Sequence, residues 1–311
     1  MSEATSTDGP GICAGRVVIV TGAGRGLGRA HALAFAREGA KVVVNDLGAE
    51  LDGTGGSSGP AGEVVAEIRA AGGEAVANGA DVADWAQAEA MVAQAVDTFG
   101  HLDVLVNNAG FLRDRMLANL AEDELDAVLR VHVKGHLAPT RHAIEHWRAR
   151  AKAGEEVQGR IINTSSGAGL LGSVGQGVYS VAKAGIATLT LVEAAELGRY
   201  GVTANAIAPA ARTRMTEQVF ADTMAAPAED AFDAMAPENV SPLVVWLASL
   251  DSGFVTGRVF EVEAGKVSLA DGWQHGPERD KGARWEPREL TDVVRELIAK
   301  APQPAPVYGA S

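Results

Sequence analysis

The sequence contains a single cysteine, Cys13, among its 311 residues. One thiol cannot form a disulfide within the chain and is a poor metal site by itself, so we expect no metal centre and a reducing compartment. The first residues, MSEATSTDGPG, lack the basic and apolar regions of a signal peptide, and the last three, GAS, do not match a Ser-Lys-Leu peroxisomal address. These absences predict a cytoplasmic protein.

Basic residues are scarce relative to acidic ones, and long apolar runs are missing. Lysine and arginine number 27 against 40 aspartate and glutamate residues, which gives a formal net charge of -13. This charge repels phosphodiester backbones, so nucleic acid is not an expected partner, although a small anionic ligand in a local basic pocket is compatible with it. No uninterrupted apolar run approaches the roughly 20 residues of a membrane span, so we expect no membrane partner.

Short β-branched runs alternate with segments of helical periodicity along most of the chain. The runs are RVVIV (16–20), KVVVN (41–45), EAVAN (74–78), DVLV (103–106), GRIINTS (159–165), VTANAIA (202–208) and RVFEVE (258–263). Strands that alternate with helices predict a parallel sheet covered on both faces. The expected fold class is therefore α/β, a single Rossmann-type doubly wound domain with a seven-stranded parallel sheet.

The two ends of the chain differ in composition from this alternating region. Residues 1–12 are predicted to be a flexible N-terminus, residues 13–270 to form the Rossmann domain, and residues 271–311 to form a C-terminal extension. The extension combines a polar, tryptophan-containing stretch, a short helical segment and a Pro-rich end. We expect it to cover the substrate pocket or a subunit interface and to finish in a loose tail.

A glycine-rich stretch, TGAGRGLG, separates the first predicted strand from the first helix. It departs from the G-x-G-x-x-G pattern, because Leu27 stands where that pattern needs glycine, and it spaces Gly22, Gly26 and Gly28 more widely. Glycines let the backbone approach a pyrophosphate, whose charge is stabilised by the N–H groups at the start of a helix. The stretch therefore predicts a dinucleotide site.

The residue at the end of the second predicted strand bears on the choice of dinucleotide. Asp46, with Leu47 beside it, follows Gly28 by 18 residues, and a carboxylate there accepts both ribose hydroxyls and repels a 2′-phosphate. Arg25 in the glycine stretch could instead pair with a 2′-phosphate. We predict NAD, because burying a carboxylate against a phosphate is more unfavourable than leaving an arginine in solvent, and we keep NADP as the alternative.

Three further motifs follow the glycine stretch in order. NNAG occupies 107–110, Ser166 precedes Tyr179 by thirteen residues, and Tyr179 and Lys183 lie one helical turn apart on one face. A tyrosine and lysine at this spacing are, by themselves, usually a surface pair. Together, the four motifs over residues 13–265 resemble the short-chain dehydrogenase/reductase family.

The resemblance implies a mechanism for the tyrosine and lysine. Tyr179 would exchange a proton with the substrate oxygen while the nicotinamide exchanges a hydride with its carbon, and Ser166 would orient that oxygen. A free tyrosine has a pKa of about 10, and we expect Lys183 to lower the pKa by favouring the phenolate. The cofactor contacts that the resemblance implies are Asp81, Val82, Asn108, Ala109, Gly110, Tyr179, Lys183, Pro209, Ala211 and Thr213.

One position departs from the family pattern. Most members carry an asparagine in the helix before the serine strand, where it supports a water relay to the lysine. Here the region reads LRVHVKGHLAP, with His132 at the matching place. We expect His132 to take the relay role as part of the catalytic group, and a satisfied core histidine is the alternative.

Several segments resemble one branch of the family in particular. VNDLG, NNAGFLRDRM, RVHVKGH and PENVSPLVVWL are similar to the (3R)-hydroxyacyl-CoA dehydrogenase domain of peroxisomal multifunctional enzyme type 2 (17β-hydroxysteroid dehydrogenase type 4) and its free-standing bacterial relatives. This similarity implies NAD-dependent oxidation of a (3R)-hydroxyacyl-CoA, with a fatty or sterol side chain, to the 3-oxoacyl-CoA. It also implies a homodimer or homotetramer built through the long helices near 122–150 and 178–199 and the last strand.

Other functions remain open from the sequence. The alternatives are an NADPH-dependent 3-oxoacyl-carrier-protein reductase, a dehydrogenase of free hydroxysteroids, and a nucleotide-sensing protein that has lost the reaction. Basic residues expected at the carboxyl edge of the sheet could bind CoA phosphates or be solvated or ion-paired; they are Arg113, Arg115, Arg212, Arg214 and Lys266. The run 215–235 is either an apolar lid or a packing helix.

Overall fold

The computed structural model describes residues 10–48, 59–212, 231–270 and 272–309. The β-branched runs form the strands β1 (Val17–Thr21), β2 (Lys41–Asn45), β3 (Glu74–Asn78), β4 (Val104–Asn107), β5 (Gly159–Thr164), β6 (Val202–Ala210) and β7 (Arg258–Glu263), followed by β8 (Lys266–Ala270). They make one sheet in the order β3-β2-β1-β4-β5-β6-β7-β8. The predicted Rossmann-type α/β class is therefore confirmed.

The prediction of a seven-stranded parallel sheet was wrong by one strand. β8 pairs antiparallel with β7, after a turn at Ala264 and Gly265 in which Ala264 has a left-handed φ of 51°. A two-residue turn of this kind brings a strand straight back beside its neighbour. Since KVSLA is short and lacks a helix before it, the alternation used for the prediction did not include it.

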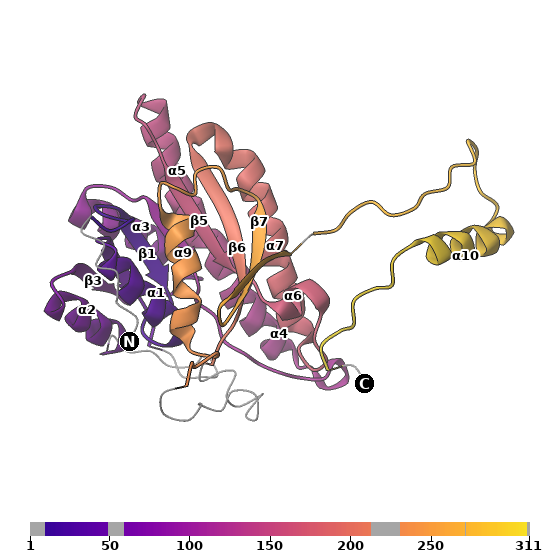
Figure 1. Ribbon diagram of the computed structural model, residues 1–311, viewed down its shortest axis with the longest axis horizontal. Helices are drawn as coiled ribbons and strands as arrows, with labels where there is room; N and C mark the ends of the chain where they lie inside the picture. Colours follow the sequence, from indigo (N-terminus) through magenta and orange to yellow (C-terminus); the bar gives the residue numbers. More distant parts are fainter. Residues whose placement is uncertain (1–9, 49–58, 213–230, 271, 310–311) are drawn as a thin grey trace.

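Two layers of helices cover the sheet (Figure 1). The helices of this domain are α1 (Gly26–Arg37), α2 (Gly59–Ala70), α3 (Trp85–Phe99), α4 (Glu122–Leu129), α5 (Gly135–Lys152), α6 (Gly167–Leu171), α7 (Gly177–Leu197) and α9 (Ser241–Ala248), of which α4 packs on α7. Because side chains alternate along a strand, Val18 and Val20 of β1 pack with α1, α2 and α9, whereas Val17 and Ile19 pack with α3 and α5. Both faces of the sheet are thus buried.

The long helix predicted near 122–150 is divided in two. A π-helical turn at Arg130–Lys134 separates α4 from α5. Gly135, which opens α5, lies so close to Val82 that a Cβ on it would approach a methyl group of that valine to 2.8 Å. The turn matters for the site, since π turns recur at functional positions and this one carries His132.

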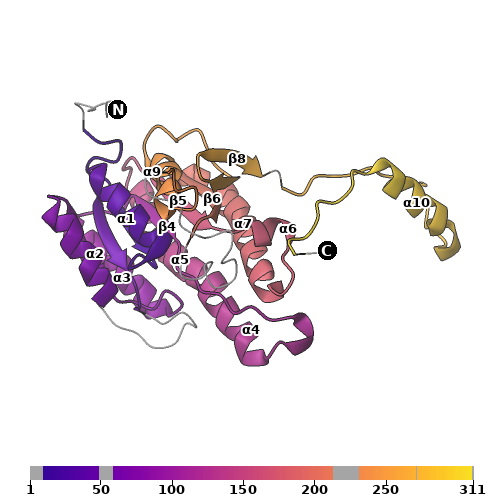
Figure 2. The ribbon, with the colours of Figure 1, turned by 60° about the horizontal axis from the view of Figure 1, so that its bottom comes forward.

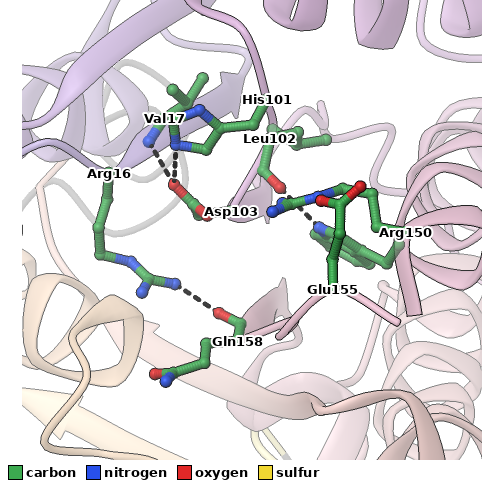
Figure 3. Close-up of polar contacts among 9 residues, drawn as sticks. Arg16, Val17, His101, Leu102, Asp103, Arg150, Glu155 and Gln158 are labelled. Atoms are coloured by element: carbon green, nitrogen blue, oxygen red, sulfur yellow. Dashed lines mark hydrogen bonds and ion pairs between the residues drawn. The ribbon is translucent and has the colours of Figure 1, made fainter. Parts of the chain in front are cut away.

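Polar contacts join the amino-terminal ends of the central strands (Figure 3). The Asp103 carboxylate accepts the Val17 N–H at 2.8 Å and lies 2.9 Å from the His101 ring nitrogen. The Arg16 guanidinium donates to the Gln158 carbonyl at 2.8 Å. These contacts hold the ends of β1, β4 and β5 at the edge of the sheet opposite to the predicted site.

The segment Gly177–Tyr200 is, by length and composition alone, apolar enough to cross a membrane, with a hydropathy of 1.2. Lys183 and Glu193 interrupt its apolar run, so the sequence predicts no membrane span there. Core helices of soluble proteins pass the same test, and this segment packs against β6, α6 and α4. Membrane insertion is not needed to explain its composition.

The C-terminal extension leaves the domain after β8 and returns to it. Figures 1 and 2 show α10 (Leu290–Lys300) held away from the sheet, and the end of the chain beside α6. An apolar stripe on α10, which includes Leu290, Val294 and Ile298, is exposed to solvent in the described chain. The return is fixed by a bridge between Ser173 and Tyr308.

Candidate active site

The glycine stretch forms a tight turn between β1 and α1. Gly22 and Gly26 have φ values of 63° and 53°, which other residues rarely adopt. A Cβ on Gly22 would lie 2.8 Å from the Cα of Ala109, and one on Gly28 would lie 2.2 Å from the Gly22 carbonyl oxygen. The turn therefore brings the glycine loop into direct contact with the loop that contains NNAG.

The start of α1 has no side-chain cap. Arg25, at the N-cap, is extended and exposed, and the first turn of the helix contains no acidic residue. The N–H groups of this turn and the positive end of the helix dipole are left for an anion. A dinucleotide pyrophosphate fits this position, and Leu27 packs its side chain against the core below.

Thr21 joins the two loops, although no sequence motif points to it. Its Oγ1 accepts the backbone N–H of Asn108 at 2.9 Å and that of Ala109 at 3.1 Å. The Asn108 amide donates in return to the Thr21 carbonyl at 2.9 Å and to that of Gly22 at 3.2 Å. These bonds align the carboxyl ends of β1 and β4, where the strand order reverses and doubly wound folds bind ligands.

Asp46 lies where the sequence places it, at the end of β2 beside the glycine loop. Its carboxylate accepts the N–H groups of Gly24 at 2.8 Å and Gly48 at 2.7 Å. The carboxylate is thus fixed at the adenosine end of the predicted cofactor site. Leu47, next to it, is 38% exposed.

The other residues predicted to contact the cofactor differ in their burial and in their bonding partners. The Asp81 carboxylate accepts a hydrogen bond from Arg130 at 2.5 Å and another from the Ala83 N–H at 2.9 Å. Each of its two oxygens is therefore bonded to a protein group. Val82 is buried against Gly135. At the end of β6, Pro209 is partly buried and Ala211 is buried, whereas Thr213 lies outside the described residues.

Ser166, Tyr179 and Lys183 are brought together at the carboxyl end of β5. Ser166 is the N-cap of α6, where its Oγ accepts the Ala168 N–H at 3.2 Å, and it hydrogen-bonds to Tyr179. The Lys183 ammonium lies 5.6 Å from the centre of the Tyr179 ring and donates to the Thr164 carbonyl at 2.6 Å. The arrangement supplies an acid–base group and a cation on one face of α7, with an orienting hydroxyl at the start of α6.

The electrostatics of the pair differ from the sequence-based expectation. Dense surrounding protein raises the pKa of Tyr179 to about 12, Asp114 adds to the increase, and the bond to Ser166 opposes it. Burial lowers the pKa of Lys183 to about 7. The expected lowering of the tyrosine pKa by Lys183 is therefore wrong for the polypeptide itself, because the phenolate and the ammonium are both desolvated.

His132 is buried against the catalytic tyrosine. Its ring meets the Tyr179 ring edge-on with 5.3 Å between centres, and Nε2 lies 2.8 Å from the Phe111 carbonyl oxygen. Burial and the nearby Lys183 charge lower the pKa of His132 to about 3, so the ring is neutral. A Cβ on Gly110 would lie 2.4 Å from the His132 ring, which therefore packs against the NNAG loop.

A buried polar network that sequence reasoning missed runs beneath the site. The Asn107 amide donates to Thr140 and Asn163, each at 2.9 Å, and the Asn163 amide donates to the Glu193 carboxyl at 2.7 Å. Glu193 is 4% exposed, and burial raises its pKa to about 7. The groups that hydrogen-bond to it, Asn163 and Thr140, carry no charge. In the sequence, Glu193 has the pattern of an ordinary surface-helix charge.

Replacing Glu193 with glutamine is expected to stabilise the protein above neutral pH. The folded protein holds the Glu193 proton up to about pH 7, whereas the unfolded chain releases it near 4.5, so stability is lost as pH rises between these values. Glu193→Gln removes this loss and should raise the free energy of unfolding at pH 8 by ~1–3 kcal/mol, with a smaller gain at pH 5. Urea unfolding at pH 5 and at pH 8 measures the free energy of unfolding of each variant. Glu196→Gln, at an exposed position of the same helix, is the matched control, and equal gains in the two variants would contradict the assignment.

The basic residues considered for CoA phosphates are largely paired with carboxylates. Ion pairs join Arg113 to Asp123, Arg115 to Glu124 and Arg212 to Asp233. Arg214 and most of the run 215–235 lie outside the described residues, and Lys266 lies on β8. The loop before α4 also borders a cavity of about 500 Å³, lined by Asp114, Arg115, Met116, Asn119, Ala121 and Glu124.

Comparisons with known proteins agree with the motifs. The profile of short chain dehydrogenases matches residues 16–224. A hydroxyacyl-CoA dehydrogenase, ChsB1 of Mycobacterium tuberculosis, is 48% identical over 92% of this chain and 89% of its own length. Peroxisomal multifunctional enzyme type 2 of Mus musculus is 47% identical over 91% of this chain, which spans 34% of that protein. The crystal structure of a short chain dehydrogenase from Mycobacterium avium is 65% identical, with a TM-score of 0.87 over 96% of this chain and all of that one.

Proposed function

The chain belongs to the short-chain dehydrogenase/reductase family, and from this premise we propose that it oxidises (3R)-hydroxyacyl-CoA thioesters to 3-oxoacyl-CoA with NAD. Membership together with the hydroxyacyl-CoA dehydrogenase relatives indicates an NAD(P)-dependent oxidoreductase that acts on secondary alcohols. The observation that carries the proposal is the grouping of Ser166, Tyr179 and Lys183 at the carboxyl edge of the sheet, the same edge as the glycine loop. The similarity to a hydroxyacyl-CoA dehydrogenase supports the substrate class.

Each catalytic residue of the chain has a different role in the proposed reaction. Bound NAD supplies the nicotinamide carbon that accepts the hydride from the substrate carbon. The Tyr179 phenolate takes the hydroxyl proton as the carbonyl forms, so one proton and one hydride leave the alcohol. Ser166 hydrogen-bonds to the substrate oxygen and holds it beside Tyr179. The Lys183 ammonium, which donates to the Thr164 carbonyl, would hold the cofactor ribose and favour the phenolate electrostatically.

The position of Asp46 supports NAD. A carboxylate fixed by Gly24 and Gly48 at the adenosine end accepts ribose hydroxyls and repels a 2′-phosphate. The exposed Arg25 at the start of α1 is the observation that favours the second candidate, an NADPH-dependent reductase of 3-oxoacyl carrier protein.

Initial rates test the substrate class. Reduced nicotinamide absorbance is followed with (3R)-hydroxyacyl-CoA thioesters of several lengths, their (3S) counterparts and one sterol-side-chain thioester. We expect turnover of the (3R) series with NAD, and the best side chain separates fatty from sterol substrates. Turnover of free hydroxysteroids or reduction of 3-oxoacyl carrier protein, with no CoA thioester oxidised, would contradict the proposal.

A homodimer or homotetramer is part of the proposal. Apolar side chains on α5 and α7 remain exposed in the single chain, among them Leu137, Val181, Leu191 and Val192. Pairing these helices with those of a second copy would remove this surface from water. Sedimentation at micromolar concentration tests it, and a species with the mass of one chain would contradict it.

A further inference from the structure

The loop before α4 is fixed against the start of α7. The Arg115 N–H donates to the Gly175 carbonyl at 2.7 Å, and Arg115 forms a parallel bridge with Gln176. Leu117 covers Gly177, where an added Cβ would lie 2.5 Å from one of the leucine methyl groups. The backbone of the loop and one of its side chains are therefore both in contact with α7, close to the catalytic tyrosine.

Asp114 of this loop lies beside Tyr179. Its Oδ2 atom accepts the Gln176 side-chain amide at 2.9 Å. Gln176 is the N-cap residue of α7 and precedes Tyr179 by three positions, so the two side chains are neighbours at the start of the helix. From this position the Asp114 charge raises the pKa of the phenol. A carboxylate is thus held next to the group that must become the base.

The Asp114 carboxylate is poorly solvated. Its Oδ1 atom is buried without a hydrogen-bond partner, and burial raises the pKa of this carboxyl. The basic residues on either side of it pair with other carboxylates, since Arg115 lies 2.8 Å from Glu124 and Arg113 lies 4.0 Å from Asp123. Because desolvation already disfavours the charge at Asp114, a further loss of water around it favours the neutral acid.

Asp114 is the acidic member of the groups around Tyr179. The groups that the structure places against the tyrosine are Ser166, His132, Lys183 and Asp114. Burial keeps His132 neutral, and the Lys183 ammonium is held by the Thr164 carbonyl. Among the described residues around the tyrosine, Asp114 therefore supplies the negative charge that opposes a phenolate.

Asp114 also connects Tyr179 to a cavity. It lines the space of about 500 Å³ beside the loop before α4, where the other charged lining residues, Arg115 and Glu124, form an ion pair with each other. The substrate oxygen is held between Ser166 and Tyr179 in the proposed reaction. A carbon skeleton that extends from this oxygen into the cavity removes water from Asp114.

We propose that Asp114 is a positioning residue that couples substrate binding to the ionisation of Tyr179 through its charge. The proposal rests on the proposed function. While solvent reaches Asp114, its carboxylate opposes the phenolate. When the substrate displaces that solvent, Asp114 takes up one proton and Tyr179 releases one, which makes Tyr179 the base. Tyr179 then takes the alcohol proton, and Asp114 returns its own proton to solvent as the product leaves, so each oxidation releases one proton.

Two pH profiles of Asp114→Asn test the proposal. The profile of kcat/KM reports ionisations before the thioester binds, and that of kcat reports those of the complex. At saturating NAD, we expect the acid limb of wild-type kcat/KM to lie about one pH unit above that of kcat. In Asp114→Asn, which keeps an acceptor for the Gln176 amide, both limbs should lie at the lower pH. On the acid limb, kcat/KM should therefore rise about tenfold. Limbs of kcat/KM that coincide in the wild type and the variant would overturn the proposal.

Two further variants complete the comparison. Asp123→Asn is the matched control, since the Asp123 side chain is 81% exposed, and we expect it to leave both limbs in place. Gln176→Leu removes the hydrogen bond that lowers the Asp114 pKa, so Asp114 is neutral over a wider pH range. The kcat/KM limb should again move to lower pH. A limb that moves to higher pH in Gln176→Leu would contradict the coupling.

Phenolate absorbance separates this inference from the substrate assignment, because it requires no turnover. The ultraviolet signal that is absent from Tyr179→Phe belongs to Tyr179. At one alkaline pH, Asp114→Asn should contain several-fold more of this phenolate than the wild type. If the wild type oxidises no thioester and this increase is found, the proposed function fails and the charge coupling stands. An unchanged phenolate signal in Asp114→Asn overturns the coupling, whichever substrate the enzyme oxidises.

Discussion

Tyr179→Phe is expected to reduce kcat by about 10³–10⁴-fold and to leave the Kd of NADH unchanged. The substitution removes only the phenolic oxygen, so the ring keeps its edge-on contact with His132 and the fold of α7 is preserved. Without that oxygen, the alcohol proton has no acceptor of suitable geometry within the site. Stopped-flow absorbance of reduced nicotinamide and a fluorescence titration measure the two quantities.

Tyr200→Phe is the matched control for this experiment. Tyr200 lies in the short helical turn after α7, where Arg199 stacks on its ring, and it is remote from Ser166. We expect it to retain wild-type rates. A Tyr179→Phe enzyme with more than a tenth of the wild-type kcat would mean that another group accepts the proton. Asp114, which influences the Tyr179 pKa, would then be the first residue to examine.

The pH dependence of the reaction should reflect the burial of the catalytic pair. In the polypeptide, surrounding protein disfavours both the Tyr179 phenolate and the Lys183 ammonium. The bond from Lys183 to the Thr164 carbonyl holds the ammonium away from the phenol. In the polypeptide alone, desolvation and this bond both oppose a phenolate at moderate pH. The spacing of Tyr179 and Lys183 places them on one face of the helix. It does not predict that the Thr164 carbonyl competes with the phenol for the lysine ammonium.

Local motifs made the fold and the outline of the site predictable. The glycine loop, Asp46 and the Tyr179–Lys183 pair each depend on short-range spacing, and the strand alternation fixes the edge at which they meet. Features that depend on distant packing were not predictable. Glu193 is buried only because Asn163 of β5 and Thr140 of α5 face it, and Tyr308 reaches Gly167 only after an excursion through α10.

The π turn illustrates the same limit within a single helix. The sequence LRVHVKGH has the periodicity of a continuous helix, and the break at Arg130–Lys134 follows from two tertiary contacts. Gly135 packs on Val82, and His132 fits between Gly110 and Tyr179. The family resemblance predicts a relay role for His132, and the structure places its ring against Tyr179. Its neutral state follows from burial, which the sequence does not reveal.

Asp46→Asn is expected to reduce the preference of kcat/KM for NAD over NADP by about 10²-fold. The amide oxygen still accepts one of the N–H groups of Gly24 and Gly48, so the loop keeps its shape. The loss of the negative charge weakens the bonds to the ribose hydroxyls by about 1.5–3 kcal/mol and removes the repulsion of a 2′-phosphate. Rates with both dinucleotides at one thioester concentration measure the ratio, and Asp97→Asn on the exposed face of α3 is the control.

Arg25→Ala completes the test of cofactor choice, because it removes the opposing charge. If Asp46 determines the preference, the wild type favours NAD, and Arg25→Ala lowers the residual rate with NADP and leaves the rate with NAD unchanged. A wild type that prefers NADP, with this preference lost in Arg25→Ala and kept in Asp46→Asn, would instead mean that the arginine at the start of α1 outweighs the carboxylate. The direction of the reaction would then be reduction, and the carrier-protein thioester would replace the CoA thioester as the substrate to examine.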